Sequence, residues 1–121
     1  MIRQEWPSMD KELKVCLSDI MTSIERIESF FQDRPMRFED YCSDWQLRLA
    51  TERCIEIIGE AMNRILKFYP DVPISNARAI VGTRNRIIHA YDAISEDIIW
   101  AIIVNHLPKL KEEIQALQNR E

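Results

Sequence analysis

Arginine, asparagine, histidine and tyrosine, four residue types with chemically capable side chains, stand together in one short run of this 121-residue chain, residues 84–91. The run holds His89, one of only two histidines, and Arg84 stands five positions before it. A histidine exchanges protons near neutral pH, with a reference pKa of about 6.5, and an arginine presents a fixed cationic fork that fits phosphate oxygens. These two residue types are sufficient for metal-free cleavage of an RNA phosphodiester, so Arg84 and His89 are the candidate catalytic residues.

The spacing of these residues limits how one copy of the chain could use them. If the run is helical, Asn85 and His89 are four positions apart and share a face, which favours an orienting role for Asn85. Arg84 and His89 differ by five positions and project about 140° apart. Either the helix loosens near His89, or a two-fold partner brings a second copy of the run alongside. We favour the dimer, because two copies of His89 supply an acid and a base together.

The chemistry that this arrangement predicts is proton transfer at a ribose and a phosphate. One His89 takes the proton of a ribose 2′-hydroxyl, while its mate or a water molecule protonates the leaving 5′-oxygen. Arg84 stabilises the charge that develops on the phosphate. This scheme requires no metal and no other cofactor. The second histidine, His106, has no ligand-type residue at metal spacing, and we expect it to be structural.

Each of these residues also has a purely structural interpretation. His89 could interact with the last carbonyls of a helix, Tyr91 could be a packing aromatic, and Asn85 could be a neutral surface residue. Glu60, in the middle of an apolar segment, could pair with an arginine of the run or face solvent. The residues alone leave these alternatives open.

The charge distribution gives a second argument for a phosphate-binding surface. The chain has 16 basic and 20 acidic residues, a net charge of −4, which argues against a protein that coats nucleic acid by bulk attraction. Residues 72–91 nevertheless contain no Asp or Glu, and they include Arg78, Arg84 and Arg86. We expect Arg78 and Arg86 to add RNA-facing charge, although three arginines on a solvated helix face are common without function.

Length and composition indicate one helical domain spanning residues 1–121. The chain is 46% hydrophobic and 30% charged, has two glycines and lacks alternating apolar runs. This composition predicts an all-α, antiparallel bundle of four to five helices. No segment resembles a signal peptide or approaches the roughly 20 apolar residues that span a bilayer, so a cytoplasmic protein without membrane contact is expected. The three cysteines lack CxxC spacing and should be free thiols.

The first predicted helix begins near Ser8 or Asp10 and ends near Phe31. It carries an apolar stripe whose members are spaced four, three, four, three and four apart: Leu13, Leu17, Ile20, Ile24, Ile27 and Phe31. Such a stripe packs against neighbouring helices at a shallow angle. Residues 32–42, with one proline and mixed polarity, are expected to form a connection.

The second predicted helix begins at a capping box in residues 43–46, with Ser43 as the cap, and ends near Phe68. Gly59 lies inside it and costs up to about 1 kcal/mol relative to alanine. A close contact with another helix at Gly59 would explain that cost.

A proline-containing linker at residues 69–73 separates these helices from two more. Ser75 is the expected cap of the helix that carries the motif run, and Ser95 is the expected cap of the last helix. Pro108 removes a backbone donor from the last helix and should kink it or split it in two. The apolar stripe of this last helix comprises Ile99, Ile103, Leu107, Leu110, Ile114 and Leu117.

The motif run resembles the R-x4-H-x-Y motif of HepT-type toxins, a branch of the HEPN ribonucleases. Arg84, His89 and Tyr91 occupy the three motif positions. The resemblance extends from about residue 11 to residue 118, because further segments match the family in order. These segments are residues 17–20, 24–27, 58–61 and 72–74, and Trp100 with residues 107–110.

The resemblance implies an HEPN-like fold and a homodimer with the two motifs at its interface. It also implies a metal-independent endoribonuclease toxin that cleaves transfer or messenger RNA and arrests growth. The usual partner of such toxins is a minimal nucleotidyltransferase antitoxin of a type II-like pair, which could join the toxin in a larger complex and transfer AMP onto Tyr91. AMP on Tyr91 would place a bulky anion beside Arg84 and His89 and compete with RNA phosphate.

Two other functional classes stay open. The same bundle could be catalytically idle and serve as the binding or regulatory partner of a nucleotidyltransferase, or it could be a structural helical adaptor. A neighbouring nucleotidyltransferase gene would support the toxin and the binding partner, whereas toxicity that disappears with Arg84→Ala or His89→Ala would support the toxin alone.

Overall fold

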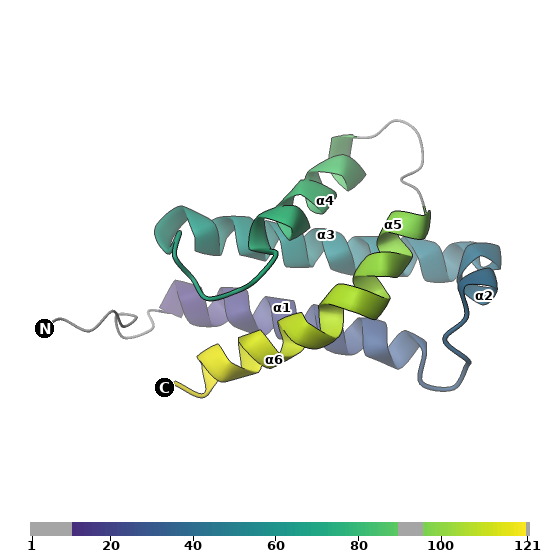
Figure 1. The fold of residues 1–121 in the computed structure, drawn as a ribbon, viewed down its shortest axis with the longest axis horizontal. Coiled ribbons are helices and arrows are strands. Elements are labelled where there is room, and N and C mark those ends of the chain that lie inside the picture. Colours follow the sequence, from purple (N-terminus) through teal and green to yellow (C-terminus); the bar gives the residue numbers. More distant parts are fainter. Residues whose placement is uncertain (1–10, 90–95, 121) are drawn as a thin grey trace, which may run out of the picture.

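The computed structural model describes residues 11–89 and 96–120, and within these ranges the chain forms helices joined by turns (Figure 1). No strand occurs in either range. The all-α prediction is confirmed, and the expected four to five helices are present when the last three elements are treated as one interrupted helix. None of the described helices is long and apolar enough to cross a membrane.

The two long helices, α1 (Lys11–Phe30) and α3 (Trp45–Phe68), lie side by side and run in opposite directions (Figure 1). Every member of the stripe predicted for α1 is buried, which confirms the expected seam. The proposed caps Ser8 and Asp10 lie outside the described residues. The predicted end of α3 at Phe68 is confirmed, but the Phe68 side chain is 63% exposed and does not belong to the core.

A short helix, α2 (Phe38–Ser43), occupies part of the segment that was predicted to be a connection, so that prediction was wrong there. Its aromatic rings pack on Trp100 of α5 (Glu96–Ala101), with centroid distances of 5.5 Å for Tyr41 and 5.9 Å for Phe38. Tyr41 is fully buried, and this burial raises the pKa of its phenol. Because the partner ring lies far away in the chain, local sequence patterns do not reveal this helix.

Asp44, and not the predicted Ser43, caps α3. The Asp44 carboxylate accepts hydrogen bonds from the backbone N–H of Leu47 at 3.0 Å and from Nη1 of Arg34 at 2.9 Å, and both hold its pKa below the usual range. The Ser43 hydroxyl donates instead to the carbonyl of Asp40 within α2. A carboxylate is favoured at a helix start because the free N–H groups there carry partial positive charge.

The next helix, α4 (Ala77–His89), packs against α3 (Figure 1). Ser75, the predicted cap, is bound elsewhere, because its backbone N–H and hydroxyl both donate to Oε2 of Glu113, at 3.0 and 2.9 Å. Asn76 follows with a φ of 60°, a left-handed conformation that asparagine adopts more readily than most residues. The entry into α4 is therefore fixed by an anchor on α6 (Leu107–Gln118).

The last helix is interrupted close to Pro108, as predicted. α5 continues into a π-helical turn, η1 (Ile102–His106), and then into α6. The N–H of Leu107 donates to the carbonyl of Ile102, five residues back, which is the π-helical pattern. A proline ring crowds the preceding turn of a helix, so a wider turn there relieves the crowding. Every member of the predicted stripe is buried, and the predicted cap Ser95 lies outside the described residues.

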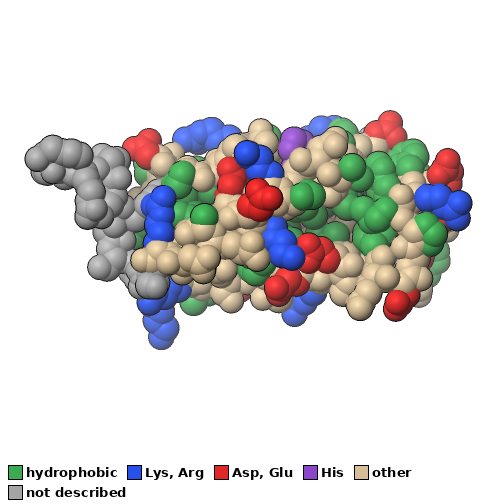
Figure 2. All heavy atoms as spheres, turned by 60° about the horizontal axis from the view of Figure 1, so that its bottom comes forward, with side chains coloured by type: hydrophobic (Ala, Val, Ile, Leu, Met, Phe, Trp, Pro, Cys, Tyr) green, Lys and Arg blue, Asp and Glu red, His purple; other side chains and the backbone are tan. Residues whose placement is uncertain are grey.

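Charge is unevenly distributed over the molecule. The face formed by α1 and α6 comes forward in Figure 2 and shows acidic and basic side chains interspersed, with apolar side chains gathering toward the end that α2 occupies. On this face Lys111 donates to Glu28 at 3.0 Å. Residues 61–91, which include the C-terminal part of α3 and all of α4, instead carry five basic residues and one acidic residue. The segment of the chain that ends with α4 is therefore basic in a protein whose net charge is negative.

Candidate active site

The candidate site is built on α4, which carries five of the predicted residues: Arg78, Arg84, Asn85, Arg86 and His89. Tyr91, the predicted modification site, lies outside the described residues. α4 is α-helical through His89, the last residue described on this side of the gap, so its backbone does not loosen between Arg84 and His89. Five positions on an α-helix correspond to about 140° around its axis. The backbone up to His89 therefore favours the route that uses a two-fold partner.

Arg84 is held against α3 at a glycine. Gly59 is buried, and a Cβ added to it would overlap Cβ of Arg84 and would lie 2.9 Å from its Cγ and 3.2 Å from the carbonyl oxygen of Ile80. The expected close helix contact at Gly59 is confirmed, and its partner is the candidate catalytic arginine. Since the glycine leaves no side chain between the two helices, the stem of Arg84 lies directly on the backbone of α3.

The head of Arg84 is also constrained. Its Nη1 donates to Oδ1 of Asn85 at 2.8 Å, and its Nε is buried without a hydrogen-bond partner among the described residues. The sequence assigned Asn85 to His89, whereas the structure shows that its amide oxygen binds Arg84. An orienting role of Asn85 toward His89 stays a prediction. A guanidinium with a buried stem and one bound nitrogen has fewer conformations to lose when it binds an anion.

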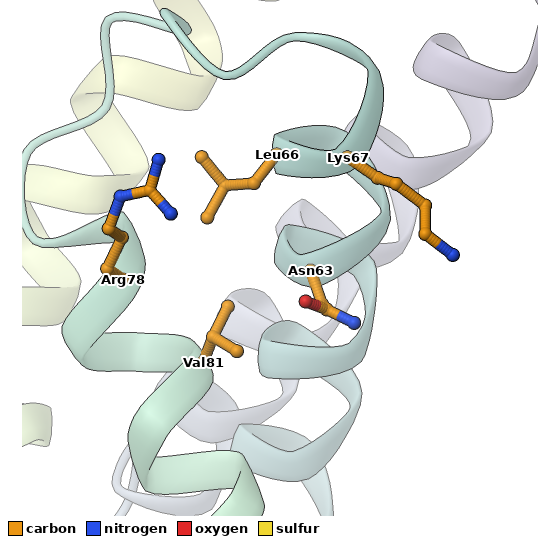
Figure 3. Close-up of a pocket in the computed structure, with 5 residues that line it drawn as sticks. All are labelled: Asn63, Leu66, Lys67, Arg78 and Val81. Carbon is orange, nitrogen blue, oxygen red and sulfur yellow. The ribbon is translucent and has the colours of Figure 1, made fainter.

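The other two arginines of α4 are exposed and lie on different faces of the helix. Arg78 precedes Asn85 by seven positions, almost two full turns, so both residues lie along one face. Arg86 is one position beyond Asn85 and therefore projects about 100° away from it. Arg78 lines a cavity between α3 and α4 (Figure 3), whereas Arg86 is exposed and is not among the residues that line it.

Sequence reasoning missed the α3 side of this cavity, which is formed by Asn63, Leu66 and Lys67. A signal was available, because residues 61–70 contain Arg64 and Lys67 and no acidic residue. The pattern was overlooked because the charge argument considered residues 72–91 alone. The basic surface thus extends from α4 onto α3.

The structure also describes two residues outside the motif run: Glu60, for which the sequence left two interpretations open, and His106, for which it predicted a structural role. Glu60 is exposed on α3, and the salt bridges in the described part of the chain do not include it, which favours the interpretation that it faces solvent. His106 is half-buried in η1, and its Nδ1 lies 3.4 Å from Nδ2 of Asn76. That contact fits the structural role expected for His106.

Comparison with known proteins assigns the chain to a family. The family described as "Ribonuclease HepT-like" matches residues 20–117, which include all of α3 and α4. The chain belongs to the HepT-like ribonuclease family. Members of this family are enzymes that cleave RNA, and the resemblance inferred from the motif run is confirmed.

Individual relatives agree with the family assignment. The "Probable ribonuclease HepT" of Thermococcus cleftensis is 32% identical, over 91% of this chain and 99% of its own length. An RNase-named protein of Methanocaldococcus jannaschii is 31% identical over 88% of both chains. An RNase-named protein of Caldanaerobacter subterraneus is 31% identical over 81% of this chain and 83% of its own. These relatives match this chain along most of their length.

Proposed function

We propose that this ribonuclease is a homodimeric, metal-independent endoribonuclease in which Arg84 and His89 are the catalytic residues. The observation that carries the proposal is the constrained position of Arg84. Its stem lies on Gly59 and its Nη1 binds Asn85, on the helix that ends at His89. A cation whose position is fixed before the substrate arrives stabilises developing phosphate charge without reorganisation during the reaction.

The proposed reaction is an intramolecular displacement in RNA. His89 accepts the proton of a ribose 2′-hydroxyl, and the 2′-oxygen forms a bond to the adjacent phosphorus. The bond from phosphorus to the 5′-oxygen breaks, and that oxygen takes a proton from the second His89 or from water. The products are a 2′,3′-cyclic phosphate and a free 5′-hydroxyl. Arg84 neutralises the charge on the non-bridging oxygens as the phosphorus becomes five-coordinate.

A second copy of the chain is proposed because one copy separates the two residues around α4. The register of α4 supports a partner at this helix. Positions 84 and 89 are five residues apart on an α-helix, a separation that corresponds to about 140° around its axis. Ile88 between them is 41% exposed, which is compatible with a surface that a partner covers. In the dimer, Arg84 of one protomer and His89 of the other can approach the same phosphate.

The direct test is cleavage of total and transfer RNA by purified protein in EDTA. Wild type should release fragments with 2′,3′-cyclic phosphate ends, and His89→Ala and Arg84→Ala should lose at least about 100-fold in rate. His106→Gln, which removes the other histidine, is the matched control and should cleave like wild type. A 2′-deoxy substitution at the cut position should block cleavage, because it removes the attacking hydroxyl.

The dimer has its own test. Light scattering should give a mass near twice the 14.4 kDa of one chain. Mixing Arg84→Ala with His89→Ala and allowing the subunits to exchange should restore part of the activity, because the mixed dimer contains one intact copy of each residue. A fully active monomer would contradict the proposal. Equal inactivity of wild type and variants, with folded dimers present, would instead favour a non-catalytic partner of a nucleotidyltransferase.

We propose further that the protein is the toxin of a toxin–antitoxin pair and acts on transfer or messenger RNA in the cytoplasm. The family assignment and the tyrosine at position 91 support a nucleotidyltransferase antitoxin that transfers AMP onto Tyr91. Wild-type protein incubated with that enzyme and ATP should gain AMP and lose cleavage activity. Tyr91→Phe should retain cleavage and gain no AMP. AMP on another residue, or a modified protein that still cleaves RNA, would refute this regulation.

A further inference from the structure

A cavity of about 270 Å³ opens between the C-terminal part of α3 and the first turns of α4 (Figure 3). Leu66 and Val81 are half-buried and contribute apolar walls, one from each helix. The guanidinium of Arg78 extends from α4 toward Leu66, whereas the side chain of Lys67 leads away from the cavity on the α3 side (Figure 3). Asn63, on α3, adds an amide to the lining of the cavity.

We propose that this cavity binds one nucleotide of the RNA strand, close to the nucleotide that is cut. The proposal rests on the ribonuclease function argued above and adds a substrate subsite to it. Arg78 binds the phosphate of this nucleotide, and Leu66 and Val81 contact its ribose or base. The amide of Asn63 offers both a donor and an acceptor to a base edge or a sugar hydroxyl.

The electrostatics of the surrounding segments favour a polyanion at this place. Residues 61–91 have a net charge of +4 while the whole chain has −4, and Asp71 is their only acidic residue. Arg78 is the second residue of α4, and the first turn of this helix has no acidic side chain. The partial positive charge of the helix start therefore adds to the charge of the guanidinium.

The register of α4 connects the cavity to the catalytic residues. Arg78 and Asn85 lie along one face of the helix and are separated by seven residues, or about 10 Å along the axis. The phosphates of a helical strand advance by about 3.4 Å per nucleotide, and an extended strand advances farther. A strand that passes the bound guanidinium of Arg84 therefore reaches the cavity within about three nucleotides.

The size and composition of the cavity suit a single nucleotide. Ligand pockets commonly enclose about 300 to 1,000 Å³, so a cavity of about 270 Å³ holds a small unit and excludes a folded RNA element. Apolar side chains combined with one cation and one amide match the flat base and charged backbone of a nucleotide.

Lys67 stands in the last turn of α3, where it also offsets the negative end of that helix, so its contribution to RNA binding should be smaller than that of Arg78.

The experiment compares charge removal at the cavity with equal charge removal elsewhere. Arg78→Gln and Lys67→Gln are paired with Arg26→Gln on α1 and Lys109→Gln on α6, all at exposed positions. Arg78→Gln should raise KM on the order of 10-fold with little change in kcat, and it should lower the dependence of log KM on log salt by about 0.7 to 1. Lys67→Gln should act in the same direction and more weakly, and both controls should stay within twofold of wild type.

A binding measurement separates this proposal from the catalytic one. A fluorescent 2′-O-methyl tetranucleotide lacks the attacking hydroxyl, so its anisotropy reports binding alone. It should bind His89→Ala like wild type and should bind Arg78→Gln about 10-fold more weakly. If wild type cuts no RNA but binding depends on Arg78, the subsite stands and the catalytic proposal fails. If RNA is cut and Arg78→Gln matches Arg26→Gln in KM, salt dependence and binding, the subsite is refuted while the ribonuclease function stands.

Discussion

Replacing Gly59 by alanine tests whether α4 depends on the space that this glycine leaves. The new Cβ would overlap Cβ of Arg84 and lie 2.9 Å from Cγ, closer than real Cβ atoms come to a neighbour. Cβ of Arg84 is fixed to its backbone, so a change of rotamer cannot relieve the overlap. α4 must shift relative to α3, and the guanidinium of Arg84 must shift with it.

The magnitude follows from two opposing effects. Overpacking of this kind destabilises by about 1 to 3 kcal/mol, and the rigid contact places it near the upper value. Alanine in a helix offsets up to about 1 kcal/mol of that cost relative to glycine. The net loss is about 2 kcal/mol, which for a chain of this length lowers Tm by about 8 °C. At 20 °C the variant should still be folded, and its kcat for RNA cleavage should fall at least about 10-fold because Arg84 is misplaced.

Gly82 provides the matched control. It lies on α4 two residues before Arg84, and a Cβ added there meets nothing within 4 Å. Gly82→Ala should raise Tm by about 2 to 4 °C through helix propensity and leave cleavage unchanged. Thermal melts followed by circular dichroism and single-turnover cleavage assays measure both effects.

A double-mutant cycle identifies the contact itself. In the background of Arg84→Gly, which removes the opposing Cβ, Gly59→Ala should cost less than about 0.5 kcal/mol. An equal cost in both backgrounds would show that the overlap with Arg84 is not the cause. A Gly59→Ala protein as stable and as active as Gly82→Ala would refute the reasoning about α4 entirely.

Three further outcomes are expected. Asn85→Ala removes the hydrogen bond to Arg84 and should lower kcat on the order of 10-fold while Tm changes by less than about 2 °C; an unchanged kcat would contradict a positioning role. Asn76→Val should lower stability by about 1 to 2 kcal/mol in urea unfolding, since a φ of 60° strains a β-branched residue, whereas Asn76→Gly should not. Burial and the nearby Glu96 raise the pKa of Glu52, so its ionisation destabilises the folded state as pH rises through the usual range of glutamate. Glu52→Gln should therefore raise Tm at pH 7 and leave it unchanged at pH 4, and the opposite pH dependence would refute this.

The sequence by itself determined the features that depend on local periodicity and on single residue types. The stripes of α1 and of the last, interrupted helix (α5, η1 and α6) are buried as predicted, because an amphipathic helix with period 3.6 buries one face. Pro108 interrupts the last helix because it lacks an N–H wherever it stands. Gly59 indicated a close contact because it costs helix stability in any fold. The motif run indicated the family because its residues lie within eight consecutive positions, so their types and their spacing are visible in the sequence alone.

Only the tertiary structure decided which distant elements meet. α2 forms where Tyr41 reaches Trp100, and Ser75 leaves its predicted cap because Glu113 of α6 accepts both of its donors. Likewise, the partner of Gly59 is Arg84, and Leu66 of α3 lines the same cavity as Arg78. These contacts join residues that are far apart in sequence. The free energy that each contact contributes depends on where, and at what angle, two whole helices cross. No pattern within one helix contains that information, because the same stripe can pack against several partners.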